Sequence, residues 1–310
     1  MEIITRKSDF SKLKGGIITL GNFDGIHLGH QKILKTLVLR GKKLKLPTIL
    51  FTFNPHPLKI ISPKKNPPLI ISGEQKASLI ASFGIDTLIL SRFTKEFASL
   101  SAKDFFEQIL LKELRPKEII IGHDYCFGKA RSGTAERLKL FAKKEGIAVR
   151  IVSAKTKGGK VVSSSRIRSL ILDGEITEAN KLLGRNFTLT GEVIKGRGVG
   201  KNLGYPTANL KTKCELIPRV GVYATYVKIA GRKKLYKGVV NIGEAPTFKR
   251  KKTIFEVHLL DFNSKLYGKF IELFFVKFIR AEKQFPLACK LAVQIEQDIK
   301  KTRALLSKGL

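Results

Sequence analysis

Residues 17–30 read IITLGNFDGIHLGH and decide the fold of the first half of the chain. The apolar run Ile17–Leu20 predicts a buried strand, and the periodic segment Leu28–Leu44 predicts an amphipathic helix. A strand that passes through a glycine-rich turn into a helix is typical of α/β proteins. Such proteins bind ligands beyond the carboxyl ends of their strands, so this turn is the first candidate for a binding site.

The turn between these two elements carries candidate binding groups. Gly21, Gly25 and Gly29 allow a ligand to approach the backbone closely, and His27 and His30 stand three residues apart at the predicted helix start. That spacing places both imidazoles on one side of the first turn, where a helix N-terminus already attracts phosphate. Two histidines that cap the helix or bind a metal are the alternative. The strand–glycine–helix context favours phosphate binding.

The rest of the first half alternates short apolar runs with longer periodic segments. The predicted strands are Ile17–Leu20, Thr48–Phe53, Asp86–Leu90, Glu118–Gly122 and Val149–Val152. The predicted helices are Leu28–Leu44, Glu74–Phe83, Ala102–Leu114 and Thr134–Glu145. Alternation of this kind predicts a mostly parallel sheet with helices on both faces.

The pattern changes near Leu183, after which the apolar runs become longer and mostly β. The predicted strands are Thr188–Lys195, Gly221–Ala230, Lys237–Ile242, Ile254–Asp261 and Phe270–Arg280. Their turn residues predict a small antiparallel barrel or sandwich. A helix is predicted for residues 286 to 306, with an apolar stripe formed by Leu287, Leu291, Ile295 and Ile299. We therefore expect two domains, residues 1–183 and 184–310.

The chain is strongly basic, with 59 Lys and Arg against 25 Asp and Glu, a net charge of +34 over 310 residues. Such a surplus suggests polyanionic partners. The first 183 residues carry 33 basic and 16 acidic side chains and the remainder carry 26 and 9, so each part has a net charge of +17. A nucleic-acid-binding arm would concentrate its charge. The even distribution favours a generally lysine-rich surface.

Three cysteines, Cys126, Cys214 and Cys289, are far apart and form no CxxC pair. They supply neither a disulfide framework nor a structural zinc site, which fits a reducing compartment. The N-terminus has no apolar signal core, and no apolar run of about 18 residues occurs. We expect a soluble, cytoplasmic protein.

Further motifs narrow the function. HLGH at His27–His30 resembles the HxGH signature of nucleotidyltransferases, which join a nucleotide to a phosphate group and release pyrophosphate. Thr52–Pro57 reads TFNPHP, Gly122–Gly133 reads GHDYCFGKARSG and Ser163–Arg168 reads SSSRIR. With the second half, these motifs resemble the bifunctional bacterial riboflavin kinase/FAD synthetases over nearly the whole chain. The resemblance implies a Rossmann-like α/β nucleotidyltransferase domain followed by a riboflavin kinase-like barrel with a C-terminal helix.

For the first domain, the resemblance implies adenylylation of FMN to FAD. His27 and His30 would hold the ATP phosphates and stabilise charge that develops on the α-phosphorus, and Ser164, Ser165 and Arg168 would bind the β- and γ-phosphates. The further expected residues are Gly21, Asp24 and Gly29 for ATP, and Asn54 and Asp124 for the flavin. On the residues alone, SSSRIR is also compatible with an N-cap and a surface helix, and NPHP with a proline-bounded turn.

For the second domain, the resemblance implies phosphorylation of riboflavin to FMN. Residues 191–209 read GEVIKGRGVGKNLGYPTAN, where Gly196, Gly198 and Gly200 could surround phosphate, although these glycines alone would favour a hairpin turn. PTAN resembles the riboflavin kinase motif, in which Thr207 and Asn209 would supply neutral oxygens to Mg²⁺ and the ATP phosphates.

Glu256, in the strand sequence IFEVHLLDF, matches the catalytic base expected by the family. A carboxylate there could orient or deprotonate the 5′-hydroxyl of riboflavin, and a solvent-facing glutamate on an edge strand is the alternative. Asn241, Thr247 and Arg280 would lie at the flavin or nucleotide. The expected co-substrate is ATP with Mg²⁺, and the expected partners are riboflavin and FMN, with no dedicated nucleic acid or membrane partner. The sequence leaves open whether the chain forms a homo-oligomer.

The chain departs from the family pattern at three positions. Relatives usually have Arg at the position of Cys126, and they often have Arg at that of Ala245 and Asp at that of Lys265. Because Cys126 lies in the expected flavin loop, one alternative hypothesis is a chain in which only the kinase is active. Another is a polyanion-binding protein that uses a face of the barrel, but the six tyrosines form no basic aromatic cluster in the sequence.

Overall fold

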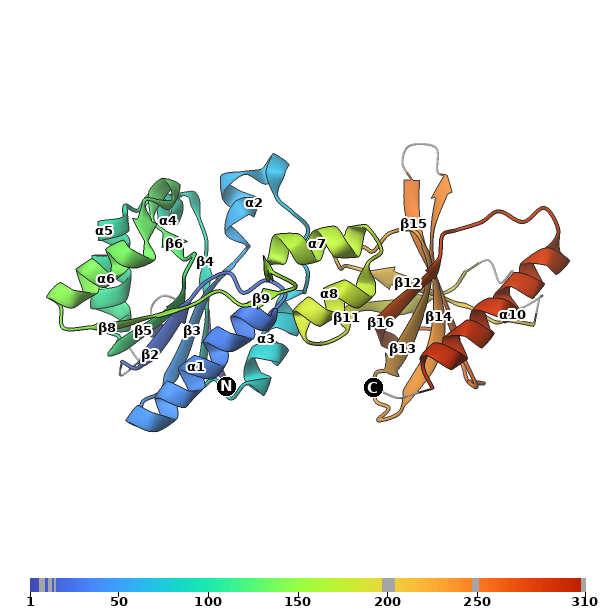
Figure 1. The fold of residues 1–310 in the computed structure, drawn as a ribbon, viewed down its shortest axis with the longest axis horizontal. Helices are drawn as coiled ribbons and strands as arrows, with labels where there is room; N and C mark the ends of the chain where they lie inside the picture. The colour runs from blue at the N-terminus through green and yellow to red at the C-terminus, as the bar shows by residue number, and fades with distance from the viewer. Residues whose placement is uncertain (6–8, 11–12, 14, 197–203, 247–250, 308–310) are drawn as a thin grey trace. The chain divides into compact units, whose positions relative to one another are not determined.

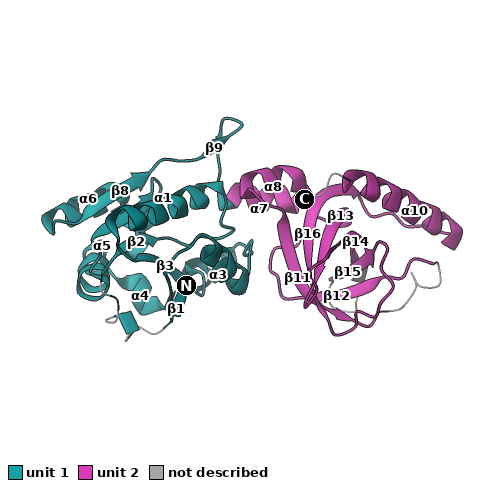
Figure 2. Cartoon of the chain, turned by 90° about the horizontal axis from the view of Figure 1, so that it is seen from below, with its two compact units in different colours: residues 1–164 teal, residues 165–310 magenta. Residues whose placement is uncertain are grey.

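The computed structural model describes residues 1–310 except 6–8, 11–12, 14, 197–203, 247–250 and 308–310 (Figure 1). The chain forms two compact units, Met1–Ser164 and Ser165–Leu310 (Figure 2). Among the described residues, no helix is long and apolar enough to cross a membrane.

The first unit is built on a six-stranded parallel sheet in the order β1-β4-β3-β2-β5-β8. The strands are β1 (Glu2–Ile4), β2 (Ile17–Leu20), β3 (Thr48–Asn54), β4 (Thr87–Arg92), β5 (Glu118–Gly122) and β8 (Ala148–Val152). The predicted parallel sheet is confirmed. The short edge strand β1 was not predicted, because three residues are too few to show a pattern.

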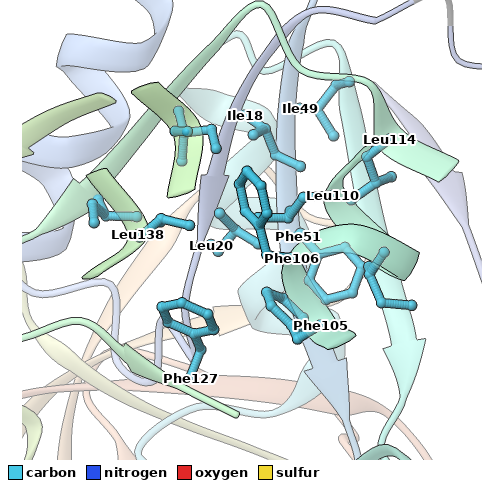
Figure 3. Close-up of a cluster of buried hydrophobic side chains, with 14 of the residues drawn as sticks. Ile18, Leu20, Ile49, Phe51, Phe105, Phe106, Leu110, Leu114, Phe127 and Leu138 are labelled. Atoms are coloured by element: carbon cyan, nitrogen blue, oxygen red, sulfur yellow. The ribbon is translucent and has the colours of Figure 1, made fainter. Parts of the chain in front are cut away.

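Helices connect these strands. The main ones are α1 (Leu28–Leu44), α3 (Gly73–Ser82), α5 (Ala102–Asp104), which continues as the π-helix η3 (Phe105–Leu114), and α6 (Ala135–Lys144). The four predicted helices are present, and the one predicted for 102–114 is mostly π-helical. The side chains of η3 pack with those of β2, β3 and β5 in a buried apolar cluster that includes Ile18, Phe51, Phe105 and Leu110 (Figure 3).

Shorter elements complete the first unit and lead into the second. They are α2 (Pro57–Ile61), η2 (Pro63–Lys65), α4 (Lys95–Ser99), β6 (Cys126–Phe127), η4 (Lys129–Arg131), β7 (Gly133–Thr134), β9 (Thr156–Lys157) and β10 (Lys160–Val161). Two helices follow, α7 (Ser164–Leu172) and α8 (Ile176–Leu183).

The second unit contains a closed antiparallel barrel in the order β11-β12-β15-β14-β13-β16. The strands are β11 (Phe187–Ile194), β12 (Ala208–Thr212), β13 (Gly221–Ile229), β14 (Leu235–Pro246), β15 (Lys251–Leu259) and β16 (Phe270–Arg280). The barrel that the sequence predicts is confirmed, and β12 is an additional strand. Buried positions alternate along β11 and β15, as expected where one face fills the barrel interior.

The C-terminal helix α10 (Ala288–Leu305) contacts β13 and β14. Ile299 packs on Val222, Val239 and Leu260 on the outside of the barrel. The predicted apolar stripe is wrong at Leu287, which is 54% exposed. Leu287 is the N-cap of α10 with an extended backbone, so its side chain does not follow the helical periodicity.

Candidate functional sites

The turn between β2 and α1 has an unusual backbone. Phe23 and Ile26 have positive φ angles of 48° and 40°, and Gly25 lies between them at 80°. Residues other than glycine seldom adopt positive φ angles, and the surrounding structure must hold their backbone there. Phe23 and Ile26 are each 1% exposed, so burial of their side chains contributes to fixing the turn.

His27 is the N-cap of α1. Its Nδ1 accepts hydrogen bonds from the backbone amides of Gly29 (3.2 Å) and His30 (3.3 Å). Because Nδ1 is the acceptor, the neutral ring carries its hydrogen on Nε2. The capping alternative is therefore confirmed for His27, and contact of its ring with phosphate stays a prediction.

The two histidines form a stacked pair. Their ring centroids are 3.7 Å apart with an interplanar angle of 17°, and His30 also contacts the Phe23 ring at 5.1 Å. A Cβ at Gly29 would stand 3.0 Å from Cε1 of His27, so glycine lets the His27 ring lie against the first helical turn. At Gly21 a Cβ would stand 3.1 Å from the ring of Phe23.

Asp24 and Ser164 meet beneath this turn. The Asp24 carboxylate is 2% exposed and accepts hydrogen bonds from the backbone amide of Ile70, while Ser164 Oγ donates to the carbonyl of Asp24 at 2.9 Å. Ser164, which lies far along the chain from Asp24, is thus brought to the turn between β2 and α1 that carries HLGH, called the HxGH turn below. These contacts position the turn, and a direct phosphate contact by either side chain stays a prediction.

Ser165 and Arg168 follow on α7, in the second unit. Ser165 is exposed, whereas Arg168 is 9% exposed although it lies on a short helix rich in polar residues. A buried arginine needs a compensating partner, and Arg168 does have interactions within the protein. Their binding of pyrophosphate stays a prediction.

The expected flavin residues of the first unit lie at the carboxyl edge of the sheet, after the two strands that flank β2. Asn54 ends β3, and Asp124 follows β5, on either side of β2 in the sheet. Both are exposed, and Asp124 Oδ1 lies 3.8 Å from Nδ1 of His123. Cys126 begins β6, and its thiol lies 3.6 Å from the carbonyl of Asp124. The sheet order thus places these residues along the same edge as the HxGH turn.

In the barrel, three candidate residues lie in one row. Glu256 on β15 pairs with Asn209 on β12 and with Asn241 on β14. Residues that pair across antiparallel strands project on the same face. Phe255 and Val257, the neighbours of Glu256, are 3% and 0% exposed, so the row occupies the opposite, outer face. The strand β15 is paired on both sides, and the edge-strand alternative for Glu256 is wrong.

The PTAN motif continues this site. Thr207 immediately precedes β12, so its side chain and that of Asn209 alternate with buried Ala208 and share a face. A Cβ at Gly196 would overlap the side-chain amide of Asn209. Glycine at this position lets the backbone lie against the asparagine as it stands. The loop glycines Gly198 and Gly200, and also Thr247, lie outside the described residues.

His258 is a site neighbour that sequence reasoning missed. It lies two residues beyond Glu256, on the same face of β15, and its Nδ1 is 2.9 Å from the carbonyl of Pro206. Its ring also contacts Tyr205 edge-on at 6.0 Å. This contact ties the start of PTAN to the strand that carries Glu256. No sequence pattern links residues about fifty positions apart in this way.

Arg280, at the end of β16, is engaged by α10. Its Nε and Nη2 donate to the Asp298 carboxylate at distances between 2.7 and 3.1 Å, and its Nη1 donates to the carbonyl of Ala281 at 3.0 Å. The two side chains are 15% and 3% exposed. The paired guanidinium links the barrel to the C-terminal helix. A further contact with nucleotide or flavin stays a prediction.

No group of three or more His, Cys, Asp or Glu residues that could hold a metal occurs within the described part of the chain. The candidate oxygen donors in the barrel are instead Thr207, Asn209 and Glu256. Such mixed neutral and carboxylate donors suit a hard cation like Mg²⁺, which keeps several waters and shares its coordination with substrate phosphates.

The chain matches two family models in sequence. Residues 9–166 match FAD synthetase, and residues 183–306 match riboflavin kinase. The bifunctional riboflavin kinase/FMN adenylyltransferase of Buchnera aphidicola subsp. Schizaphis graminum is 40% identical over 285 residues, which cover 91% of each chain. The protein of that name from Escherichia coli K12 is 35% identical over 92% of this chain and 91% of the relative.

A solved structure also matches the whole fold. The crystal structure described as a macrolide-efflux protein from Streptococcus pneumoniae aligns with a TM-score of 0.89 and 32% identity, over 98% of this chain and 99% of that one. The sheet, the barrel and the two sequence matches lead to one conclusion: this chain belongs to the family of bifunctional riboflavin kinase/FMN adenylyltransferases.

Proposed function

We propose that the chain converts riboflavin to FAD in two ATP-dependent steps. Residues 184–310 phosphorylate riboflavin to FMN, and residues 1–183 adenylylate FMN to FAD and release pyrophosphate. The observation that carries the proposal is the row Asn209–Glu256–Asn241, which places a carboxylate between two amides, one of them from the PTAN segment. Membership of the family supports the same assignment.

Adenylyl transfer needs no covalent nucleophile, because a phosphate oxygen of FMN attacks the α-phosphorus of ATP. Catalysis then consists of positioning and of neutralising charge. His27 is held at the start of α1, because its Nδ1 accepts hydrogen bonds from the amides of Gly29 and His30. His30, stacked on His27, offers a second ring at the helix N-terminus. Ser165 and Arg168 are proposed to bind the leaving pyrophosphate, and Asn54 and Asp124 the flavin.

Riboflavin phosphorylation needs a group that orients or deprotonates the 5′-hydroxyl. Glu256 is proposed as that base, with Asn241 towards the flavin and Asn209 and Thr207 towards the ATP phosphates. These last two residues would hold Mg²⁺, which when bound neutralises phosphate charge. Gly196, Gly198 and Gly200 are proposed to surround the phosphates, and Thr247 and Arg280 to lie towards flavin or nucleotide.

The test is a product analysis. The purified chain is incubated with riboflavin, ATP and Mg²⁺, and FMN and FAD are separated by chromatography at successive times. We expect FMN first and FAD later, with release of pyrophosphate in the second step. Absence of both products would contradict the proposed function.

A kinase without the second activity is a second candidate, because Cys126 replaces the usual arginine in the expected flavin loop. Its thiol lies 3.6 Å from the carbonyl of Asp124, a proposed flavin residue. Incubation with FMN, ATP and Mg²⁺ discriminates between the candidates: pyrophosphate release and FAD support the bifunctional enzyme, whereas neither product supports the kinase alone.

A further inference from the structure

A buried lysine lies beneath the HxGH turn. Lys76, on α3, is 7% exposed, and its Nζ donates a hydrogen bond of 2.8 Å to the backbone carbonyl of Asn22. The two residues are 54 positions apart in the sequence. Lysine is almost never fully buried unless its charge is compensated, so a lysine at this position calls for an explanation.

The burial is energetically unfavourable for the charged side chain. It lowers the pKa of Lys76 from its usual value, and the Asp24 carboxylate acts in the opposite direction. Asp24 is itself 2% exposed. An apolar residue at position 76 would avoid the desolvation cost. The ammonium group and the carboxylate must therefore contribute something else at this turn.

The turn depends on side chains for its geometry. Lys76 and Thr52 donate to the carbonyl of Asn22, at 2.8 and 3.3 Å, and Ser164 donates to that of Asp24 at 2.9 Å. Gln31 Nε2 donates to the carbonyl of Ile26 at 2.9 Å. Alternate carbonyls of one turn, at positions 22, 24 and 26, are thus each held by a side chain, and those at 22 and 24 by side chains distant in sequence.

These side-chain hydrogen bonds lie along the strained part of the backbone. Phe23, Gly25 and Ile26, which have positive φ angles, lie between the first anchored carbonyl and His27. Strained backbone persists only where the surroundings fix it. Lys76 holds the N-terminal end of this segment, and it supplies the only charged donor among the four side chains named above.

We propose that Lys76 is a positioning residue for adenylyl transfer: it fixes the turn that carries His27 and His30 through the Asn22 carbonyl and Asp24. The proposal rests on the function proposed for the first unit. Lys76 does not touch substrate. It acts by keeping the two imidazoles where they meet the ATP phosphates, and a misplacement of about 1 Å in such a site can lower the rate about 100-fold.

The test compares Lys76→Met with wild type. Methionine keeps much of the length and apolar stem of lysine but removes the donor and the charge. We expect kcat for FAD formation from FMN and ATP to fall about 10- to 100-fold, with KM for either substrate changed by less than about threefold because ground-state contacts remain. Lys43→Met, which removes an exposed lysine from α1, is the matched control and keeps the wild-type kcat.

Two further measurements separate positioning from a general structural role. Riboflavin phosphorylation by the same Lys76→Met sample should keep the wild-type rate, which shows that the second unit is folded and that the effect is confined to the first. The chain has five histidines, so their imidazole NMR signals can be assigned by single substitutions. The signals of His27 and His30 should shift in Lys76→Met, and those of His258 should not.

The outcomes are distinct. A wild type that makes no FAD contradicts the proposed function, whereas unshifted His27 and His30 signals overturn the role of Lys76 whatever the activity. An adenylylation kcat within twofold of wild type also overturns it, as does an equal loss of both activities. Should Lys76→Met fail to fold, Lys76→Gln, which removes the charge and whose amide is one bond too short to take the place of Nζ, is judged by the same criteria.

Discussion

Glu256 and Asn209 lie directly opposite one another on adjacent strands of the barrel, in a register that also aligns Asn241 with Glu256 on the other side. A residue from the PTAN segment and the proposed base therefore share one face, although the chain passes through two other strands between them. The barrel thus assembles oxygen and nitrogen groups in a row from the consecutive strands β14 and β15 and from β12, which is distant from them in sequence.

Asn209→Ala tests this row. Removal of the amide should lower kcat/KM for riboflavin phosphorylation by about 100-fold, the range found when one positioned polar group is lost at a reacting centre. FAD formation from FMN should keep its wild-type rate, because it is assigned to residues 1–183. Both rates are measured on one preparation, and an equal loss of both would contradict the assignment.

His27→Asn separates capping from phosphate binding. Asparagine is a good N-cap and can accept from the same amides, but it lacks an imidazole donor. We expect a thermal midpoint close to that of wild type, with FAD formation reduced at least about 100-fold. His27→Ala loses the cap as well and should be destabilised by about 1 kcal/mol. Normal FAD formation by His27→Asn would show that His27 only caps the helix.

Asp298→Ala tests the link between α10 and the barrel. The change leaves the Arg280 guanidinium without its carboxylate at a site where both side chains are largely buried. Breaking such a pair costs about 3–5 kcal/mol, so the thermal transition of the barrel should move to a clearly lower temperature. Lys300→Ala, which removes an exposed helix pair with Glu296, should move it little, and equal shifts for the two variants would contradict the account.

Cys126→Arg tests the position in the expected flavin loop where this chain has cysteine and relatives usually have arginine. If the usual arginine binds the flavin phosphate, the substitution should raise kcat/KM for FMN adenylylation by about tenfold, the effect of one charge-assisted hydrogen bond. Riboflavin phosphorylation should not change. Cys289→Arg, at an exposed position on α10, controls for the added charge. An unchanged or lower value for Cys126→Arg would argue against this role of the arginine.

Local patterns in the sequence predict much of the fold. The bounds predicted for the helix Leu28–Leu44 match those in the structure, because its apolar periodicity starts and stops there. The strand Glu118–Gly122 is visible in the sequence as an apolar run. Leu287 was predicted wrongly because it continues the spacing of the stripe in sequence but stands before the helix. The strand β12 was missed because it is short and follows a glycine-rich stretch.

The candidate site residues also fall into two groups, those visible in local motifs and those placed only by tertiary contacts. HxGH, PTAN and Glu256 are visible because each motif is local, and pairing of strands then brings the last two together. Lys76 and His258 were missed because their roles depend on contacts with carbonyls about fifty residues away. A lysine in an amphipathic helix ordinarily indicates a solvated position, and only the tertiary structure shows that this one is buried.

The division of labour between the two units is tested most directly by Glu256→Gln. The variant keeps the size of the side chain and a hydrogen-bonding group, but it cannot act as a base. It is supplied with ATP and Mg²⁺ and either riboflavin or FMN, and the flavin products are separated by chromatography. We predict no FMN from riboflavin and FAD from FMN at the wild-type rate. Loss of both activities in the folded variant, or normal FMN formation, would contradict the account.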